Sequence, residues 1–287
     1  MDAEKLILLQ NKILEVVEYF DCFCTENKIT YYLMGGSALG AIRHKGFIPW
    51  DDDFDVFMDN ENYHKFCKAA SNKLDTDLFY FQKENTKEWP LFFSKIRMNG
   101  TTMIEKDVVG RAMHHGIYID VMCLNKTVKS KASRYVQYLA ARILSATALS
   151  KKGYVTTSIL KRFLLVTVKV LSFNSVQKVL LAIVRQYNKK NSDLVGHFFG
   201  RAPFDRTTFN VNFLGNPRIV KFENLQLPVP SNVEEYLTIR YGKNYMRLPS
   251  EKEKMKYPSH AFIVDTEKSY MEYFEKTKDH TAQVLKQ

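Results

Sequence analysis

The spacing of apolar residues predicts that helices and strands alternate over the first 125 residues. Some stretches repeat apolar positions every three or four residues, as amphipathic helices do, whereas short β-branched and aromatic runs are typical of strands. The predicted helices span 3–24, 38–44 and 61–74, and the predicted strands span 29–34, 54–58, 78–82, 91–97, 101–104, 117–122 and, later in the chain, 218–222.

A further helix is predicted in the last third of the chain. Ser231 and Glu234 have the Ser-x-x-Glu pattern of a capping box, and Gly242 suits the position just after a helix. Taken together, the elements predict an α+β fold in which a mixed sheet is flanked by helices and interrupted by a helical insertion.

That insertion is the basic part of the chain. No acidic residue lies between Asp120 and Asp193, while residues 126–190 hold 14 of the 42 Lys and Arg and account for the net charge of +11. Three sets of apolar positions recur there at helical spacing: Ala132, Tyr135, Val136, Leu139, Ile143 and Thr147; Leu160, Phe163, Leu164, Val168 and Leu171; and Val176, Val179, Leu180, Ile183 and Tyr187. We divide the chain into a core over 1–125, the insertion over 126–192 and a C-terminal part over 193–287.

Two interpretations fit the insertion. It either docks on anionic lipid or a polyanionic acceptor, or it is an ordinary helical subdomain with a solvated basic face. Its longest nearly apolar run, 163–173, contains Lys169 and is far shorter than the roughly 20 residues of a membrane span. We favour docking on an anionic membrane surface, and we expect no nucleic-acid partner because the segment lacks a recognised binding motif.

Cysteine usage and the N-terminal sequence indicate the compartment. The four cysteines form no CxxC pair, which argues against a disulfide scaffold or a structural zinc site. The N-terminus opens acidic and lacks the basic stretch of a secretory signal. We therefore expect a cytoplasmic protein with reduced thiols, peripheral on the inner membrane face.

The most informative segment is Asp51-Asp52-Asp53-Phe54-Asp55. Because strand side chains alternate, Asp53 and Asp55 should point to one face and Phe54 into the core. Two carboxylates about 6.6 Å apart on one strand repel each other unless a cation lies between them. Hard oxygen ligands suit Mg²⁺, or Mn²⁺ in its place. Asp51 and Asp52 precede the strand and fit a solvated acidic loop.

A third carboxylate and a phosphate site complete the predicted centre. Asp120 is the single acidic residue of an apolar strand, where a charge is costly unless it is paired or metal-bound. Gly35, Gly36 and Ser37 precede a helix whose N-terminal amides, with the Ser37 hydroxyl, suit a phosphate; the alternative is a plain turn with a helix cap. This combination indicates phosphoryl or nucleotidyl transfer.

Three basic residues are candidates for contact with the phosphates of a donor. Lys95 and Arg97 alternate onto one face of their predicted strand and suit a diphosphate, although a charge pair at a sheet edge is the alternative. Arg43 follows the short helix after the glycines and is also expected to contact donor phosphates.

The block from Gly35 to Asp53 closely resembles the LicD family, within the nucleotidyltransferase fold of the polymerase-β type. Lys95-Ile96-Arg97, the strand that holds Asp120, and Tyr241-Gly242 are also similar to that family. The similarity extends over most of the chain and is weakest in the insertion.

The resemblance implies a metal-dependent transferase that moves a phospho-alcohol from a CDP-alcohol donor. Phosphocholine from CDP-choline is the first expectation, and fukutin-related proteins use CDP-ribitol on a similar core. The acceptor would be a cell-surface glycan, such as teichoic acid or lipopolysaccharide, or its lipid-linked precursor. Asp53, Asp55 and Asp120 would bind the metal and be catalytic. The alternatives are a nucleotidyltransferase that transfers NMP to a small molecule and a non-catalytic membrane-surface adaptor on the same fold.

Overall fold

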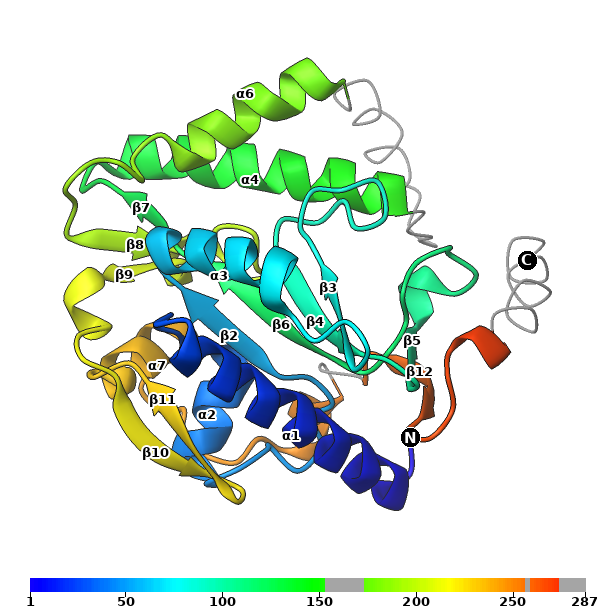
Figure 1. The fold of residues 1–287 in the computed structure, drawn as a ribbon. Helices are drawn as coiled ribbons and strands as arrows, with labels where there is room; N and C mark the ends of the chain where they lie inside the picture. Colours follow the sequence, from blue (N-terminus) through cyan, green and yellow to red (C-terminus); the bar gives the residue numbers. More distant parts are fainter. Residues whose placement is uncertain (153–172, 256–258, 274–287) are drawn as a thin grey trace.

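The computed structural model describes residues 1–152, 173–255 and 259–273, and its centre is a five-stranded mixed sheet (Figure 1). The strands of this sheet are β1 (Tyr32–Leu33), β2 (Asp55–Met58), β3 (Phe79–Gln82), β4 (Ser94–Met98) and β6 (Tyr118–Cys123). They lie in the order β1-β2-β6-β4-β3, with β2 and β6 parallel and the other neighbours antiparallel. The predicted α+β class with a mixed sheet is confirmed.

Helices pack against this sheet through apolar faces. Helix α1 (Ala3–Glu26) and helix α3 (Asn60–Lys73) contact each other through the rings of Phe20 and Phe66, 5.7 Å apart. Helix α1 buries the predicted apolar stripe. On the face of β2 that carries Phe57, the ring of Phe57 packs edge-on against Tyr236, which lies in helix α7 (Val233–Tyr241).

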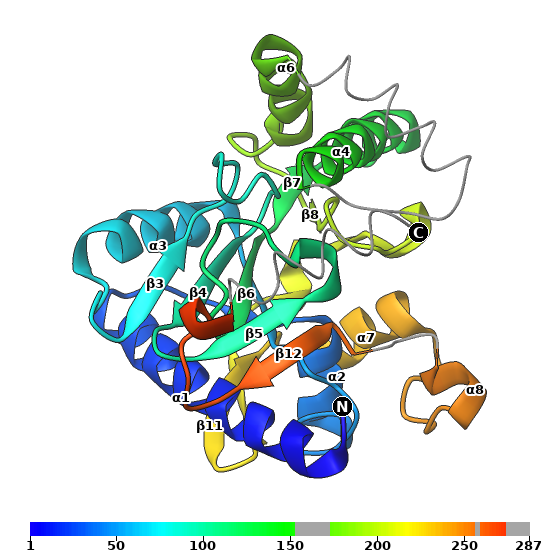
Figure 2. The same cartoon turned by 90° about the vertical axis from the view of Figure 1, so that its right-hand side faces the viewer.

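Three smaller sheets surround the central one. Strand β5 (Thr102–Glu105) pairs with β12 (Ala261–Asp265), which brings the C-terminal part back to the core (Figure 2). The other two sheets are the hairpin of β10 (Arg218–Phe222) with β11 (Leu225–Val229) and the sheet of β7 (Asn125–Thr127), β8 (Leu194–Gly196) and β9 (Thr208–Asn210). The remaining short elements are α8 (Glu251–Lys254) and the 3₁₀ turns η1 (Lys106–Val108), η3 (Phe204–Arg206) and η4 (Val211–Phe213).

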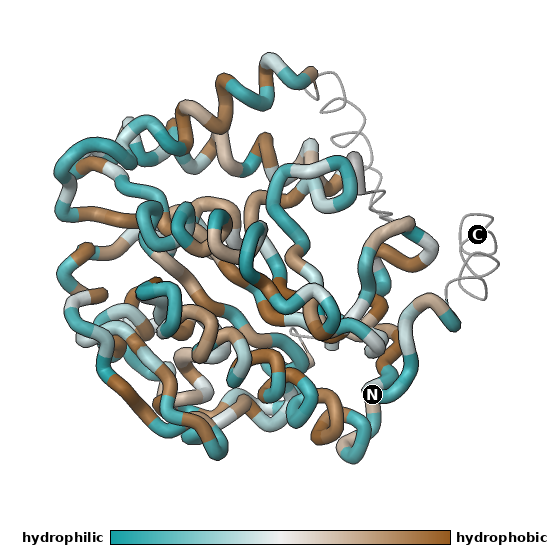
Figure 3. The backbone as a smooth tube through the Cα atoms, in the orientation of Figure 1, coloured by the Kyte–Doolittle hydropathy of each residue, from teal (hydrophilic) through white to brown (hydrophobic). Residues whose placement is uncertain are grey.

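The insertion contains two of the predicted helices in its described part. Helices α4 (Lys131–Lys152) and α6 (Asn174–Arg185) pack together around a small apolar cluster that includes Leu144 and Val184, and both alternate between hydrophobic and hydrophilic colours in Figure 3. The third predicted set, Leu160 to Leu171, lies outside the described residues. None of the described helices is long and apolar enough to cross a membrane.

Helix α4 turns part of its predicted apolar set to solvent. Tyr135, Val136 and Leu139 are exposed, whereas Ala141 and Leu144 are fully buried against α6. The contact of α4 with α6 is made partly by alanines, which the spacing of large apolar residues does not indicate.

The bounds of the predicted elements agree with the structure within three residues, and two differences are informative. The strand predicted over 29–34 shortens to Tyr32–Leu33, and the next helix, α2 (Gly35–Arg43), already begins at the glycines. The capping box predicted at Ser231 is wrong, because Asn232 is the N-cap and makes no side-chain cap bond. Gly242 is confirmed as the helix C-cap, with φ +93°.

Candidate active site

Parallel pairing of β2 and β6 brings the predicted carboxylates together. Asp55 is the register partner of Asp120 on the neighbouring strand. Asp53 precedes Asp55 by two residues and shares its face of the chain. The three carboxylates are near enough for their charges to act on one another, since Asp53 and Asp120 both raise the pKa of Asp55. The predicted acidic centre is thus one cluster in space.

Burial makes this cluster electrostatically costly when it is fully ionised. Burial raises the pKa of Asp55 well above its ordinary value, and the charges of Asp53, Asp120 and Asp51 raise it further. Burial is also the main cause that raises the pKa of Asp53 and of Asp120. A group of buried carboxylates with raised pKa values is stabilised in its anionic form by a cation.

One such cation is Lys95. Its Nζ lies 2.7 Å from Oδ1 of Asp120 and 3.6 Å from Oε1 of Glu105, and the side chain is buried. The ammonium group also lies 3.2 Å from the ring centroid of Tyr118. Burial lowers the pKa of Lys95, while Asp120 and Glu105 act to raise it. Lys95 therefore holds a carboxylate of the cluster, and its contact with a donor stays a prediction.

The other two predicted basic residues make contacts within the protein. Arg97 is completely buried, where its Nε donates to Oε1 of Gln82 at 2.8 Å and its Nη1 donates to the carbonyl of Gly116 at 2.9 Å. Arg43 is the last residue of α2, and it donates to the carbonyl of Tyr245 at 3.0 Å. These contacts indicate structural roles, and donor binding by Arg97 or Arg43 stays a prediction without a supporting contact in the described residues.

The N-terminus of α2 adjoins the carboxylate cluster. Gly35 has φ +50°, a backbone region that favours glycine, and its N–H donates to Oη of Tyr236 at 3.1 Å. A Cβ at Gly36 would lie only 2.7 Å from Oδ2 of Asp51. The predicted need for small residues thus has a concrete cause: a carboxylate lies directly against this helix end.

Ser37 connects the helix end to β2. Its buried Oγ accepts the backbone N–H of Asp55 at 2.8 Å, which fixes the start of the strand relative to the helix. The amides of Gly36 and Ser37 are in the first turn of α2, where backbone N–H groups have no partner within the helix. They are donors available to an anion at this end.

Asp52 has a role that the sequence did not reveal. It is 1% exposed, and it accepts hydrogen bonds from Oγ of Ser259 at 2.6 Å, from Nδ1 of His260 at 3.0 Å and from the N–H of Ala261 at 2.9 Å. We call these four residues the Asp52 clamp. The expectation of a solvated acidic loop is wrong for Asp52, because the clamp joins this loop to the start of β12. Partners more than 200 positions away leave no local signal.

The clamp also brings a second cation to the cluster. Nδ1 of His260 lies 3.5 Å from Oδ2 of Asp53. The hydrogen bond to Asp52 is the main cause that raises the pKa of His260, to about 9. Lys95 and His260 therefore place positive charge at opposite ends of the cluster, next to Asp120 and Asp53 respectively.

The carboxylates suit a magnesium ion that is shared with a substrate. Within the described ranges, no group of three or more His, Cys, Asp or Glu side chains is arranged to hold a metal ion by itself. Mg²⁺, however, is usually bound by one or two carboxylates together with water and substrate phosphates. Asp53 and Asp55 offer two hard oxygen ligands. A cation bound between them would lower their raised pKa values and so stabilise both side chains as carboxylates.

Comparison with known proteins finds similarity to one family. The family model for the nucleotidyltransferase domain of LicD, FKTN and FKRP matches residues 28–117, which include the α2 glycines, Asp53, Asp55 and Lys95. The chain is 28% identical over 263 residues to the lipopolysaccharide cholinephosphotransferase LicD of Haemophilus influenzae, an alignment that covers 87% of this chain and 95% of the relative. An uncharacterized protein of Rickettsia typhi is 47% identical over 81 residues, 22% of this chain and 26% of that protein. The LicD-type nucleotidyltransferase domain thus surrounds the carboxylates, and the chain is similar to a LicD protein along most of its length.

Proposed function

We propose that this protein transfers a phosphorylated alcohol from a CDP-alcohol donor to a glycan. The observation that carries the proposal is the partly buried cluster of Asp53, Asp55 and Asp120 beside the N-terminus of α2. The Haemophilus influenzae relative is named a cholinephosphotransferase of lipopolysaccharide, so phosphocholine is the first candidate for the group transferred and a surface glycan is the first candidate for the acceptor.

Each part of the cluster has a distinct role in this proposal. Asp53 and Asp55 would hold Mg²⁺, for which Mn²⁺ can substitute, and the bound ion would neutralise charge on the donor diphosphate. The amides of Gly36 and Ser37 donate to a donor phosphate, as helix N-termini commonly do. Lys95 holds Asp120 in one orientation beside Asp55.

The reaction that follows is an in-line displacement at phosphorus. A hydroxyl oxygen of the glycan forms a bond to the phosphorus that carries the alcohol, and the bond between that phosphorus and the bridging oxygen of CMP breaks. CMP leaves with the bonding electrons. The hydroxyl proton passes to a carboxylate of the cluster. Asp120 is our candidate acceptor of this proton, because a carboxylate with a raised pKa is a better base than an exposed one.

Product analysis separates this proposal from its alternatives. The protein is incubated with Mg²⁺, a lipopolysaccharide acceptor and either CDP-choline or CTP with choline, and the products are followed by ³¹P NMR. Release of CMP with a phosphodiester on the glycan supports phospho-alcohol transfer. Release of pyrophosphate from CTP means transfer of NMP instead. Binding of the protein to vesicles without turnover of either nucleotide favours the adaptor.

We further propose that the protein works in the cytoplasm on the inner membrane face, where a lipid-linked acceptor would be met. Support comes from the insertion: Tyr135, Val136 and Leu139 of α4 are exposed large apolar side chains on a segment without any acidic residue. Basic and apolar side chains together suit reversible docking on anionic lipid.

A further inference from the structure

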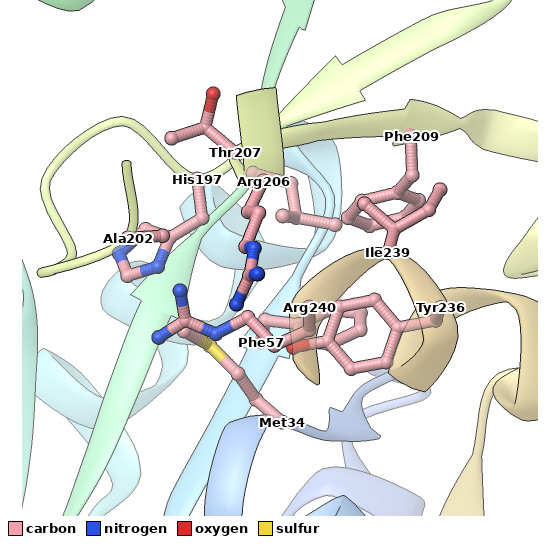
Figure 4. A pocket seen from close by; sticks show the side chains of 11 residues that line it. Met34, Phe57, His197, Ala202, Arg206, Thr207, Phe209, Tyr236, Ile239 and Arg240 are labelled. Atoms are coloured by element: carbon pink, nitrogen blue, oxygen red, sulfur yellow. The ribbon is translucent and has the colours of Figure 1, made fainter. Parts of the chain in front are cut away.

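A second polar feature is a narrow pocket between α7 and the turn η3 (Figure 4). It encloses about 10 Å³, roughly the space for one water molecule. Its wall combines apolar and basic side chains, among them Met34, Phe57, His197, Arg206, Tyr236 and Arg240. No acidic residue lines it.

The two arginines make the pocket strongly electropositive. Figure 4 shows the guanidinium groups of Arg206 and Arg240 converging in the pocket from η3 and α7. In the described part of the chain, neither forms an ion pair with a carboxylate, and Nε of Arg240 is buried without a hydrogen-bond partner. Burial, with a further effect of Arg240, lowers the pKa of His197 to about 3, so its ring is neutral. Two converging guanidinium groups without a counter-charge repel each other and favour an anion.

The pocket shares residues with the candidate active site. Phe57 follows Asp55 by two residues on β2, so both side chains lie on one face of the strand, about 6.6 Å apart along it. The hydroxyl of Tyr236 accepts the N–H of Gly35, while its ring lines the pocket. An anion at the arginines would therefore lie next to the site where phosphates of the substrate are expected.

We propose that Arg206 and Arg240 form a phosphate-binding subsite of the enzyme. It would take a phosphate monoester or diphosphate group, because a planar guanidinium donates two parallel hydrogen bonds to phosphate oxygens. The enclosed space of the pocket holds only part of such a group, and the exposed Arg206 forms its outer side. The assignment of this subsite to a substrate of the enzyme rests on the proposed function. The phosphate comes either from the donor diphosphate or from a phosphorylated acceptor.

Binding of inorganic phosphate tests the subsite without relying on turnover. Isothermal titration calorimetry is done on the full chain without metal, at constant ionic strength set with chloride. Arg206→Gln and Arg240→Gln should each weaken phosphate binding at least about tenfold, the size of one charge-assisted hydrogen bond, and the double variant should weaken it further. Arg218→Gln, which removes an exposed arginine paired with Glu234, should bind like the wild type. Equal affinity of the double variant and Arg218→Gln would overturn the subsite.

Kinetics then separate the two sources of phosphate. Arg206 is exposed, so Arg206→Gln should fold normally, and circular dichroism verifies this. A KM that rises at least about tenfold for CDP-choline alone assigns the subsite to the donor, and the same rise for a phosphorylated glycan alone assigns it to the acceptor. Unchanged KM values for both would overturn its role with substrates. If the wild type binds phosphate through these arginines but transfers no phospho-alcohol, the subsite stands and the proposed function fails.

Discussion

Lys95 and Asp120 form a buried ion pair, with Nζ of Lys95 2.7 Å from Oδ1 of Asp120 and side-chain exposures of 2% and 12%. The pair joins β4 to β6 at the point where Asp120 of β6 is the register partner of Asp55 of β2. A buried carboxylate that loses its cation is strongly destabilising, whereas loss of both charges costs less. This ion pair therefore connects the stability of the sheet to the arrangement of the carboxylates.

Lys95→Met should lower the free energy of unfolding by about 3–5 kcal/mol, because Asp120 is left buried without its cation. Adding Asp120→Asn should restore a large part of this loss without restoring activity. Urea denaturation of the variants measures both effects, and Lys68→Met, at an exposed helix position, is the matched control. Equal stability of Lys95→Met and Lys68→Met would contradict the structural role of the pair.

Asp52→Asn should loosen the Asp52 clamp. An asparagine amide offers one acceptor oxygen where the carboxylate offers two, so at least one of the three donors loses its partner, at a cost of about 1–3 kcal/mol. Hydrogen exchange should accelerate in β12 and stay unchanged in β10, which does not contact the clamp. Asp77→Asn, in an exposed loop, is the control. Unchanged protection of β12 in Asp52→Asn would show that the clamp does not hold this strand.

The buried ring of His115 should make stability depend on pH. Burial lowers the pKa of His115 to about 4, and among the described residues no hydrogen-bond acceptor lies against its Nδ1 to stabilise the protonated ring. Between pH 6.5 and 4 the unfolded chain then binds more protons, so stability falls as the pH falls, by about 1.4 kcal/mol per pH unit for this residue.

His115→Gln should reduce that slope, whatever its effect at pH 7.5. Chemical denaturation from pH 7.5 to 4.5 measures the slope, and His64→Gln, an exposed histidine on α3, is the comparison. If the stability of His115→Gln falls with pH as steeply as that of the wild type and of His64→Gln, His115 is not held neutral in the folded protein.

The basic insertion should bind anionic vesicles in a salt-sensitive way and bind neutral ones weakly. Each Lys or Arg near an anionic surface contributes on the order of 1 kcal/mol, so a few suffice for reversible docking. The matched sets for substitution by Gln are Lys131, Lys178, Lys189 and Lys190 in the insertion and Lys5, Lys68, Lys83 and Lys221 elsewhere, all exposed.

Vesicle flotation compares the two sets. Substitution of the four lysines in the insertion should weaken vesicle binding strongly. Substitution of the four lysines elsewhere removes equal charge and should have a small effect. Absence of flotation of the wild type with either vesicle type at low salt would refute membrane docking, and the insertion would then serve acceptor binding or assembly.

The local sequence pattern predicted the parts of the candidate site that lie close together in the sequence. Alternation along β2 places Asp53 and Asp55 on one face, and the apolar setting of Asp120 marks it as a charge that needs a partner. The fold class follows from the same periodicities. The strands β7, β8, β9, β11 and β12 were missed. Strands β7, β8 and β9 have three residues each, and β7 and β12 pair with segments that are far away in the sequence.

Long-range contacts explain the remaining differences. The sequence does not show that Arg97 ends in hydrogen bonds to Gln82 and Gly116, because a basic residue alternating on a strand suits a ligand equally well. It does not reveal that Asp52 is buried by Ser259 and His260, or that Arg206 and Arg240 meet in one pocket. In each case tertiary packing brings together residues that are far apart in the sequence, so no local pattern indicates the contact.

The most direct test of the account is the rate of CMP release from CDP-choline, with Mg²⁺ and a lipopolysaccharide acceptor, in Asp53→Asn and Asp55→Asn. Each change removes one charge from the carboxylate pair, so each should slow release about 1,000-fold, equivalent to several kcal/mol of transition-state stabilisation. The metal-free melting temperature should stay the same or rise, because a buried like charge is gone. Asp193→Asn, at an exposed carboxylate, should keep the wild-type rate. CMP release near the wild-type rate in either Asp53→Asn or Asp55→Asn would contradict the assignment of these carboxylates to catalysis.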